Sequence, residues 1–186
     1  MDNGAGSYRR FRDNGDESGL DEIIRTYRDG LTLYLSNLVE NIRTAEELAE
    51  DTFVLIGIRK PRFKGKSTFK TWLYAIGRHL ALDYLRKQAK HPAVPLDELP
   101  EQAGAADAVE AAYFRKERQR TLHRAMQKLH PEYRQVLWLI YFEGFTNKEA
   151  ADVMRKSVRG VESVLYRARK SLKAQLEAEG FDDEEL

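Results

Sequence analysis

An acidic, proline-rich stretch at residues 91–110 limits what this chain can fold into. It holds three of the five prolines among the 186 residues, together with five acidic residues and neither lysine nor arginine. Proline removes a backbone hydrogen-bond donor and breaks helices, so this composition is typical of a linker. Each flanking part is close to the lower size limit for an independent hydrophobic core. We therefore expect two small domains, over residues 20–90 and 111–176.

Helical periodicity dominates the part before this linker. Apolar residues recur every three or four positions over residues 20–39, which predicts a helix that Gly30 bends or weakens. Thr44 and Glu47 have the spacing of a capping box, in which each side chain bonds the backbone amide of the other residue. A second helix is therefore expected from Thr44 to about Ile58.

A third and longer helix is expected within residues 63–90. Ser67 can cap its first turn after a basic, glycine-containing loop. The apolar residues that form one arc of this helix, and are expected to face the core, are Phe69, Leu73, Ile76, Leu80 and Tyr84. Residues 59–90 hold ten lysines or arginines and a single acid, Asp83, although the whole chain has a net charge of only +1.

This concentration of positive charge has two interpretations. A basic run is commonly a solvated helix face, with Trp72 in the core. Here the basic residues alternate with aromatic ones, a combination suited to neutralising phosphates while stacking the bases of a separated strand. We favour nucleic-acid binding.

Four acids gather near the expected start of the second helix: Glu46, Glu47, Glu50 and Asp51. Carboxylates at a helix N-terminus interact favourably with the helix dipole. The same group could instead dock a basic partner. The residues alone leave both explanations open.

The part after the linker has the order of a helix-turn-helix domain. A basic helix is expected over residues 113–129, and Pro131 at a first helical position opens the next helix, which Gly144 ends. A second capping box, T-N-K-E at residues 146–149, starts a short helix over residues 147–154.

Ser157 then caps the last helix, whose apolar residues recur at helical spacing. Residues 155–173 hold seven basic groups against one acid, Glu162. A helix-turn-helix with such a basic outer face is typical of a helix that enters the major groove of DNA.

The remaining composition excludes several classes of protein. Residues 1–19 are rich in Gly, Asp, Asn and Ser and are expected to be poorly ordered, and residues 177–186 form an acidic tail. There is no cysteine, and the four histidines lack the spacing of metal ligands, so we expect no metal and no other cofactor. No apolar run approaches the roughly 20 residues needed to span a bilayer, and the N-terminus has no apolar signal core, which predicts a cytoplasmic protein without membrane insertion.

Several segments in the same order resemble bacterial RNA polymerase sigma factors of the extracytoplasmic function (ECF) group. AEELAEDTF at residues 45–53 resembles the region 2 segment that grips the polymerase clamp, and residues 63–87 resemble the segment that melts the promoter and reads its minus-10 element. LHPEYRQVLWLIYFEGFTNKEAADVM and SVRGVESVLYRARKSL resemble region 4, which reads the minus-35 element.

The resemblance implies an all-α fold, with a region 2 bundle and a region 4 helix-turn-helix domain joined by a flexible linker. It also implies three groups of contact residues. Core polymerase would bind Glu46, Glu47, Glu50, Asp51 and Phe53. Minus-10 DNA would bind Lys64, Lys66, Ser67, Thr68, Phe69, Lys70, Trp72, Arg78, His79 and Arg86. Minus-35 DNA would bind Arg159, Ser163, Tyr166, Arg167 and Lys170.

The sequence departs from the family pattern at a few positions. His79 stands where asparagine is frequent, so the minus-10 base preference is expected to differ. Arg155 occupies a turn where glycine is usual, which is costly if that turn needs a positive φ. Glu162 and Val164 replace residues that are commonly basic or polar, so the minus-35 preference cannot be carried over.

The resulting hypothesis is a promoter-specificity subunit without catalysis of its own. It would bind core RNA polymerase and promoter DNA and promote melting, and the resemblance implies an anti-sigma factor as a further partner. The alternatives are a helix-turn-helix regulator that binds duplex DNA without polymerase and an all-helical interaction scaffold. An enzyme has the least support, because the Asp, Glu and His residues show no catalytic grouping.

Overall fold

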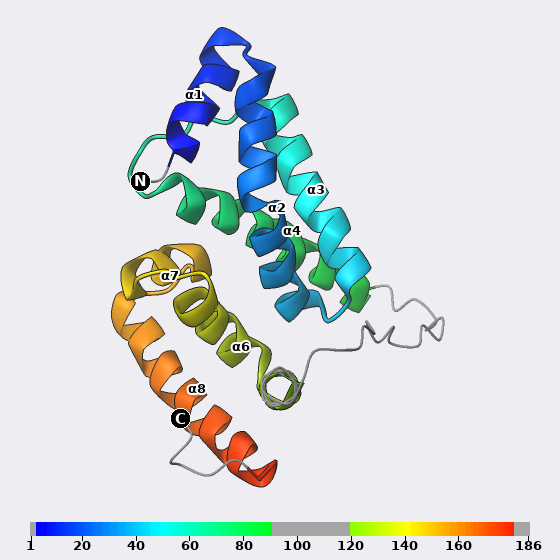
Figure 1. Cartoon of the computed structure of the whole chain (residues 1–186), viewed down its shortest axis with the longest axis vertical. Coiled ribbons are helices and arrows are strands. Elements are labelled where there is room, and N and C mark those ends of the chain that lie inside the picture. The colour runs from blue at the N-terminus through cyan, green and yellow to red at the C-terminus, as the bar shows by residue number, and fades with distance from the viewer. Residues whose placement is uncertain (1–2, 91–119, 181–186) are drawn as a thin grey trace, which may run out of the picture.

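The computed structural model describes residues 3–90 and 120–180, and within them the chain is helical without a β-strand. The all-α prediction is confirmed. The helices are α1 (Gly4–Asn14), α2 (Glu17–Val39), α3 (Ile42–Arg59), α4 (Phe69–Lys90), an unlabelled helix at residues 120–127, α6 (Pro131–Leu137), the π-helix η1 (Trp138–Phe142), α7 (Asn147–Met154) and α8 (Val158–Ala178). As Figure 1 shows, α1–α4 form one group and α6–α8 a second group beside α4 and α2. The expected linker at residues 91–110 lies outside the described residues.

The expectation that residues 1–19 are poorly ordered is wrong, because α1 occupies most of them. Its buried residues are Gly4, Ser7, Tyr8 and Phe11, at the i, i+3, i+4 and i+7 spacing of one helix face. The small residues that suggested disorder allow close packing instead. A Cβ on Gly19 of α2 would overlap the carbonyl oxygen of Ser7, so the glycine lets the two helices meet backbone to backbone.

Two helices of the first domain are capped by residues other than those that the sequence predicts. The side chain of Asn41, rather than Thr44, caps α3 by accepting a hydrogen bond from the Thr44 amide at 3.0 Å. Thr68, rather than Ser67, caps α4 by accepting from the Thr71 amide at 3.2 Å. Because α3 starts at Ile42, the acids of this helix lie beyond its first turn. The dipole explanation for them therefore loses its basis.

The caps of the second domain agree with the sequence. Thr146 and Glu149 form the reciprocal capping box of α7, and Ser157 caps α8 by accepting from the Gly160 amide at 3.1 Å. The turn between these helices places Arg155 at φ 53°, the left-handed conformation that glycine adopts without strain. The helix opened by Pro131 differs from a regular α-helix, because its last turn widens into η1.

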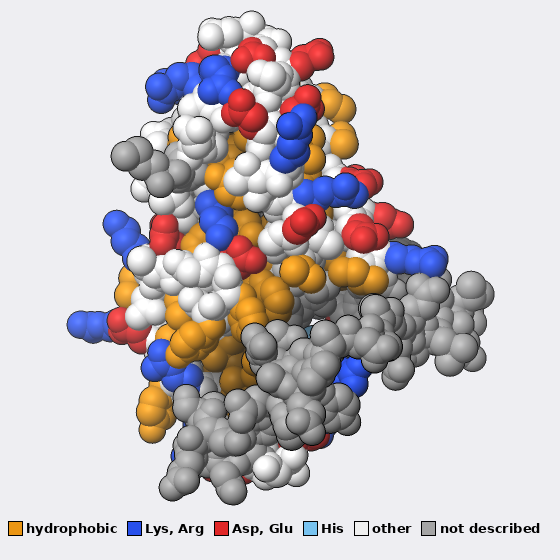
Figure 2. Space-filling model, viewed as in Figure 1, with side chains coloured by type: hydrophobic (Ala, Val, Ile, Leu, Met, Phe, Trp, Pro, Cys, Tyr) orange, Lys and Arg blue, Asp and Glu red, His pale blue; other side chains and the backbone are white. Residues whose placement is uncertain are grey.

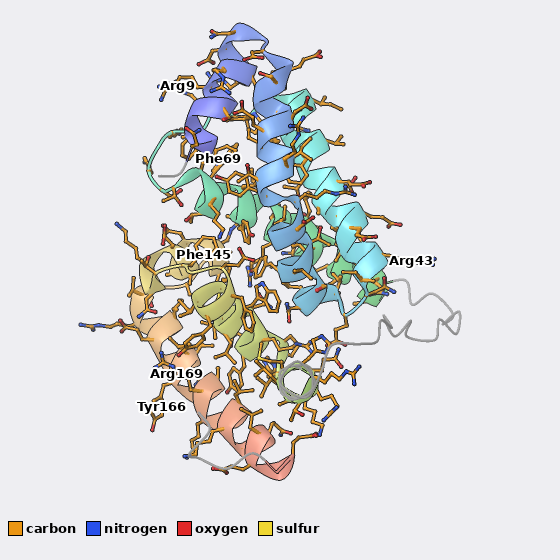
Figure 3. The ribbon with its side chains drawn as sticks, viewed as in Figure 1. Arg9, Arg43, Phe69, Phe145, Tyr166 and Arg169 are labelled. Carbon is orange, nitrogen blue, oxygen red and sulfur yellow. The ribbon has the colours of Figure 1, made fainter. Side chains whose placement is uncertain are left out.

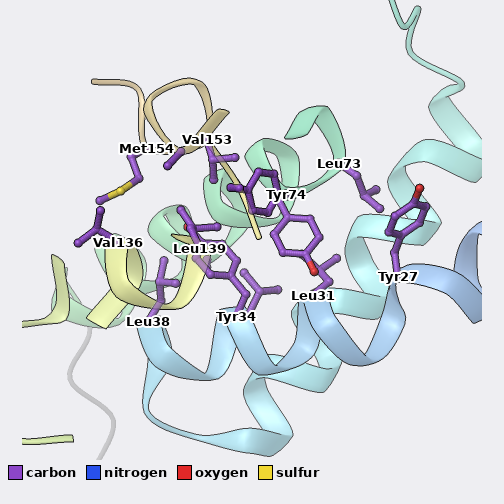
Figure 4. Packing of buried hydrophobic residues seen from close by; sticks show 14 of the residues in the cluster. Tyr27, Leu31, Tyr34, Leu38, Leu73, Tyr74, Val136, Leu139, Val153 and Met154 are labelled. Atoms are coloured by element: carbon purple, nitrogen blue, oxygen red, sulfur yellow. The ribbon is translucent and has the colours of Figure 1, made fainter. Parts of the chain in front are cut away.

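One continuous hydrophobic core runs through both domains (Figure 4). Leu31 and Tyr34 of α2 and Leu73 and Tyr74 of α4 belong to the same buried cluster as Leu139 of the second domain. Hydrophobic side chains also gather across the middle of the face drawn in Figure 2, over the region where α6 and α7 lie beside α4. Apolar packing thus joins the two domains along α4.

Candidate polymerase and nucleic-acid interfaces

The last helix presents the predicted minus-35 contacts to solvent. The side chains of Arg159, Ser163, Tyr166, Arg167 and Lys170 are all exposed on α8, and Tyr166 retains 71% of its accessible surface. Figure 3 shows Tyr166 pointing away from the body of the protein. The opposite face of α8 packs against the rest of the second domain. Val164 is buried there, so its departure from the family pattern concerns packing.

The predicted minus-10 contacts are divided between solvent and the interior. Lys64 and Lys66 on the loop, and His79 and Arg86 on α4, are exposed, and both His79 and Arg86 pair with Asp83. Ser67 and Trp72 are half-buried. Phe69 is fully buried, so its ring belongs to the core and cannot stack on a base in this arrangement.

Four aromatic rings cluster where α4 meets the loop of residues 60–68, which we call the capture loop and which itself contributes Phe63. The ring centroid of Trp72 lies 5.2 Å from Tyr8, 5.4 Å from Phe63 and 5.4 Å from Phe69. Tyr8 and Phe69 are buried, whereas Phe63 and Trp72 are half-buried at the rim of the cluster. Phe63 and Trp72 are therefore the rings that a base can reach.

Glu143 holds the part of α4 that faces the second domain. Its carboxylate lies 2.9 Å from the Nζ of Lys70 and accepts a hydrogen bond of 2.7 Å from the hydroxyl of Tyr74. The indole of Trp138 donates to the other carboxylate oxygen at 3.3 Å. The Glu143 side chain is only 10% exposed. Burial, followed by the neighbouring charge of Glu143, raises the pKa of Tyr74, which keeps this hydroxyl protonated as a donor.

Other polar contacts also join the two domains, and together with those of Glu143 they form what we call the interdomain seam. The Nε of Arg78 donates to Gln135 at 3.0 Å, and the hydroxyl of Thr68 donates to Glu149 at 3.3 Å. Buried Arg134 of α6 forms an ion pair with Glu40 at the end of α2. Three predicted minus-10 contacts, Thr68, Lys70 and Arg78, are thus bonded to the second domain.

The predicted polymerase contacts lie on one helix but differ in exposure. Glu46, Glu47, Glu50 and Asp51 are exposed on α3, whereas Phe53 is buried in the core and is not available to a partner in this structure. Two apolar side chains without a predicted role are exposed in the second half of the same helix: Val54 at 53% and Ile58 at 78%. They continue the spacing of Glu47 and Asp51, which puts an apolar patch beside the acids.

Residues 3–90 and 120–180 contain no group of three or more His, Cys, Asp or Glu side chains that could hold a metal ion. No helix in the same two ranges is long and apolar enough to cross a membrane.

Comparisons with known proteins match both domains. Residues 23–91 match the family model of sigma-70 region 2, and residues 119–172 match that of sigma-70 region 4. The ECF RNA polymerase sigma factor SigM of Bacillus subtilis is 31% identical over 165 residues, which cover 89% of this chain and 99% of SigM. This chain belongs to the ECF sigma factors. The resemblance stated from the sequence is therefore confirmed, and sigma factors recognise DNA without being enzymes.

Solved structures support the fold of this sigma factor. The sigma factor RpoE from Bartonella quintana, in complex with the anti-sigma factor NepR, superposes with a TM-score of 0.67 at 20% identity, covering 84% of this chain and 96% of RpoE. CnrH, in complex with the cytosolic domain of CnrY, superposes with a TM-score of 0.64 at 22% identity, covering 94% and 95%. Helix α1 precedes the region 2 match, which begins at residue 23.

Proposed function

We propose that this sigma factor binds core RNA polymerase through α3, docks α8 on the minus-35 duplex, and captures bases of the opened minus-10 element with the capture loop and α4. The observation that carries the proposal is the presence of two exposed surfaces of different kinds in one chain, each rich in basic residues. The exposed face of α8 suits a duplex, whereas the rim formed by Phe63 and Trp72 suits an unpaired strand. A regulator that binds only duplex DNA needs no such rim.

The polymerase surface combines the acids of α3 with Val54 and Ile58. Well-packed, desolvated side chains near the centre of an interface contribute most of the affinity, and charged side chains around them mainly steer association. We assign the centre to Val54 and Ile58, and the surrounding charge to Glu47 and Asp51. Buried Phe53 supports this surface from inside.

Strand capture needs a favourable contact that appears only when the duplex opens. Unstacking a base costs a few kcal/mol, and stacking it on an aromatic side chain returns about 1 to 3 kcal/mol. Trp72 offers that contact, and Lys64 and Lys66 on the exposed capture loop offer charge to the phosphates of the same strand. No nucleotide hydrolysis is required.

The interdomain seam adds a condition to this function. Thr68, Lys70 and Arg78 would have to give up their bonds to Glu149, Glu143 and Gln135 to bind DNA with the same polar groups, which requires the second domain to leave α4. We propose that core polymerase and the opened minus-10 strand bind the separated domains and that an anti-sigma factor binds the packed form. The sigma factor RpoE, which has this fold, was co-crystallised with the anti-sigma factor NepR. A factor acting on polymerase and chromosomal DNA is expected in the cytoplasm.

The decisive experiment is run-off transcription from a genomic library, with core polymerase alone and with core polymerase plus this protein. We expect new transcripts whose start sites share two upstream elements. Gel filtration would show co-elution with core polymerase. Failure to co-elute, together with tight duplex binding, would favour a polymerase-independent regulator instead.

A further inference from the structure

We infer that α1 positions the capture loop and the Trp72 ring for strand capture, and that Tyr8 is the positioning residue. This inference rests on the proposed function, and it concerns a helix that lies before the region 2 match. Tyr8 is buried, so its own ring is not accessible to DNA. It would act through the loop and ring that it contacts.

Helix α1 is attached firmly to the body of the first domain. The carboxylate of Glu22 on α2 accepts hydrogen bonds of 2.7 Å from the hydroxyl of Ser7 and from the guanidinium of Arg10. These two bonds lower the pKa of Glu22, so the acceptor stays charged at neutral pH. A Cβ on Gly4 would lie 2.5 Å from the ring of Phe69, which shows how closely α1 covers the start of α4. Helix α1 is therefore held in place and can position the residues that it contacts.

Tyr8 joins this helix to the capture loop in two ways. Its ring lies 5.2 Å from that of Trp72 and 5.4 Å from that of Phe69. Its hydroxyl donates a 2.7 Å hydrogen bond to the carbonyl oxygen of Pro61, fifty-three positions away along the chain. Burial raises the pKa of Tyr8 to about 12, so the hydroxyl remains a donor throughout the physiological range.

The bond to Pro61 holds the loop near its start, directly after the chain turns away from α3. Helix α3 ends at Arg59, and Lys60 follows at φ 43°, a left-handed turn that sends the chain in a new direction. The Nζ of Lys60 lies 4.5 Å from the ring centre of Phe11, a second contact of α1 at this turn. Beyond it, residues 62–68 are mostly exposed. Helix α1 thus sets the position from which the basic part of the loop extends.

The test is Tyr8→Phe in the full chain, which removes the bond to Pro61 and keeps the ring in its cluster. Tyr133→Phe on α6 is the matched control, because it makes the same chemical change in the second domain. Hydrogen–deuterium exchange of the free protein reports the order of the loop. Fluorescence anisotropy of the holoenzyme, with a labelled pool of single-stranded DNA of randomised sequence, reports strand capture.

We expect Tyr8→Phe to speed amide exchange over residues 62–68 several-fold and to weaken strand binding by roughly two- to tenfold, the usual effect of losing one hydrogen bond. Exchange in α8 and the affinity for core polymerase should not change, and Tyr133→Phe should behave as the wild type. Unchanged exchange in the loop would overturn the inference. The inference would also be overturned if Trp72→Ala weakened strand binding while Tyr8→Phe bound the strand as the wild type does. If the wild-type holoenzyme binds no single strand, the proposed function fails, while the exchange measurement still decides whether Tyr8 positions the loop.

Discussion

The two helices proposed to bind DNA, α8 and α4, differ in how accessible their predicted contact residues are. Every predicted contact on α8 lies in solvent, so this helix can meet a duplex without rearrangement. On α4 and its capture loop, Thr68, Lys70 and Arg78 are bonded to the second domain instead. We therefore expect duplex recognition by α8 not to depend on opening the seam, whereas strand contacts from Thr68, Lys70 and Arg78 should depend on it.

The chemistry of the seam explains how it could open. Glu143 and Glu149 present carboxylate oxygens to Lys70 and Thr68, which are also groups that could bind a phosphate. Withdrawing a carboxylate from water costs free energy, and the bonds from Lys70 and Tyr74 offset much of it. A DNA strand that offers phosphates to the same lysine can therefore compete with the second domain.

The largest effect is expected from Trp72→Ala, which removes the stacking surface on α4 and leaves α8 unaltered. Losing about 1 to 3 kcal/mol of stacking should reduce open-complex formation by about fivefold to about 150-fold, as measured by permanganate footprinting. Minus-35 duplex binding is the internal control. Because Trp72 also borders the core, an equal loss of core polymerase binding would contradict a stacking role and indicate misfolding.

Arg167→Ala tests the other helix. If Arg167 reads a base, affinity for the minus-35 duplex should fall by about 1 to 3 kcal/mol, and if it holds a phosphate, the salt dependence should flatten by about one unit. Titrations at several salt concentrations distinguish the two. Arg9→Ala, which removes an exposed arginine from α1, controls for the loss of one positive charge. Unchanged affinity and salt dependence would remove Arg167 from the interface.

Glu143→Gln should make the predicted DNA contacts on α4 more accessible, as those on α8 already are. The variant weakens the bonds to Lys70 and Tyr74 with little change in shape, and a loss of roughly 1 kcal/mol would favour the open form about fivefold. Small-angle scattering should detect expansion, and single-strand binding by the free protein should tighten. The matched control is Glu132→Gln, whose ion pair with Lys156 stays within the second domain. If the two variants scattered alike and bound single strands equally well, the seam would not be what limits the access of DNA to α4.

The smallest effect concerns pH and Glu149, which both caps α7 and accepts a bond from Thr68. Burial opposes its ionisation, but hydrogen bonds, chiefly from Thr146, hold its pKa below the ordinary 4.5. A depressed carboxyl pKa stabilises the folded state above that ordinary value, and this stabilisation is lost as pH falls through the folded pKa. Urea unfolding of Glu149→Gln should therefore depend less on pH below about 4.5. A wild-type pH dependence in this variant would show that other carboxyls account for it.

Local signals in the sequence predicted much of the fold. The α7 capping box, the Ser157 cap and the basic face of α8 each depend on residues within a few positions of one another, and all three are present. The caps Asn41 and Thr68 were missed because each stands next to a competing candidate within three positions. Helix α1 was missed because its buried small residues have the composition of a disordered segment.

The exposure of individual side chains needed the tertiary structure. The resemblance assigned contact roles to Phe53 and Phe69, yet both rings are buried because neighbouring helices cover them, as periodicity alone predicts for Phe69. Val54 and Ile58 are exposed for the converse reason, since no described helix packs over that side of α3. An apolar residue at helical spacing shows which face it belongs to, but not whether that face is covered.

The sequence by itself determined that this protein is helical, that it carries two basic surfaces, and that it resembles the ECF sigma factors. These properties follow from helix period, capping and charge, which act over a few residues. Only the tertiary structure decided that Glu143 meets Lys70, seventy-three positions earlier, and that Tyr8 meets Pro61. Such contacts depend on how covered faces fit together in three dimensions, which no local pattern specifies.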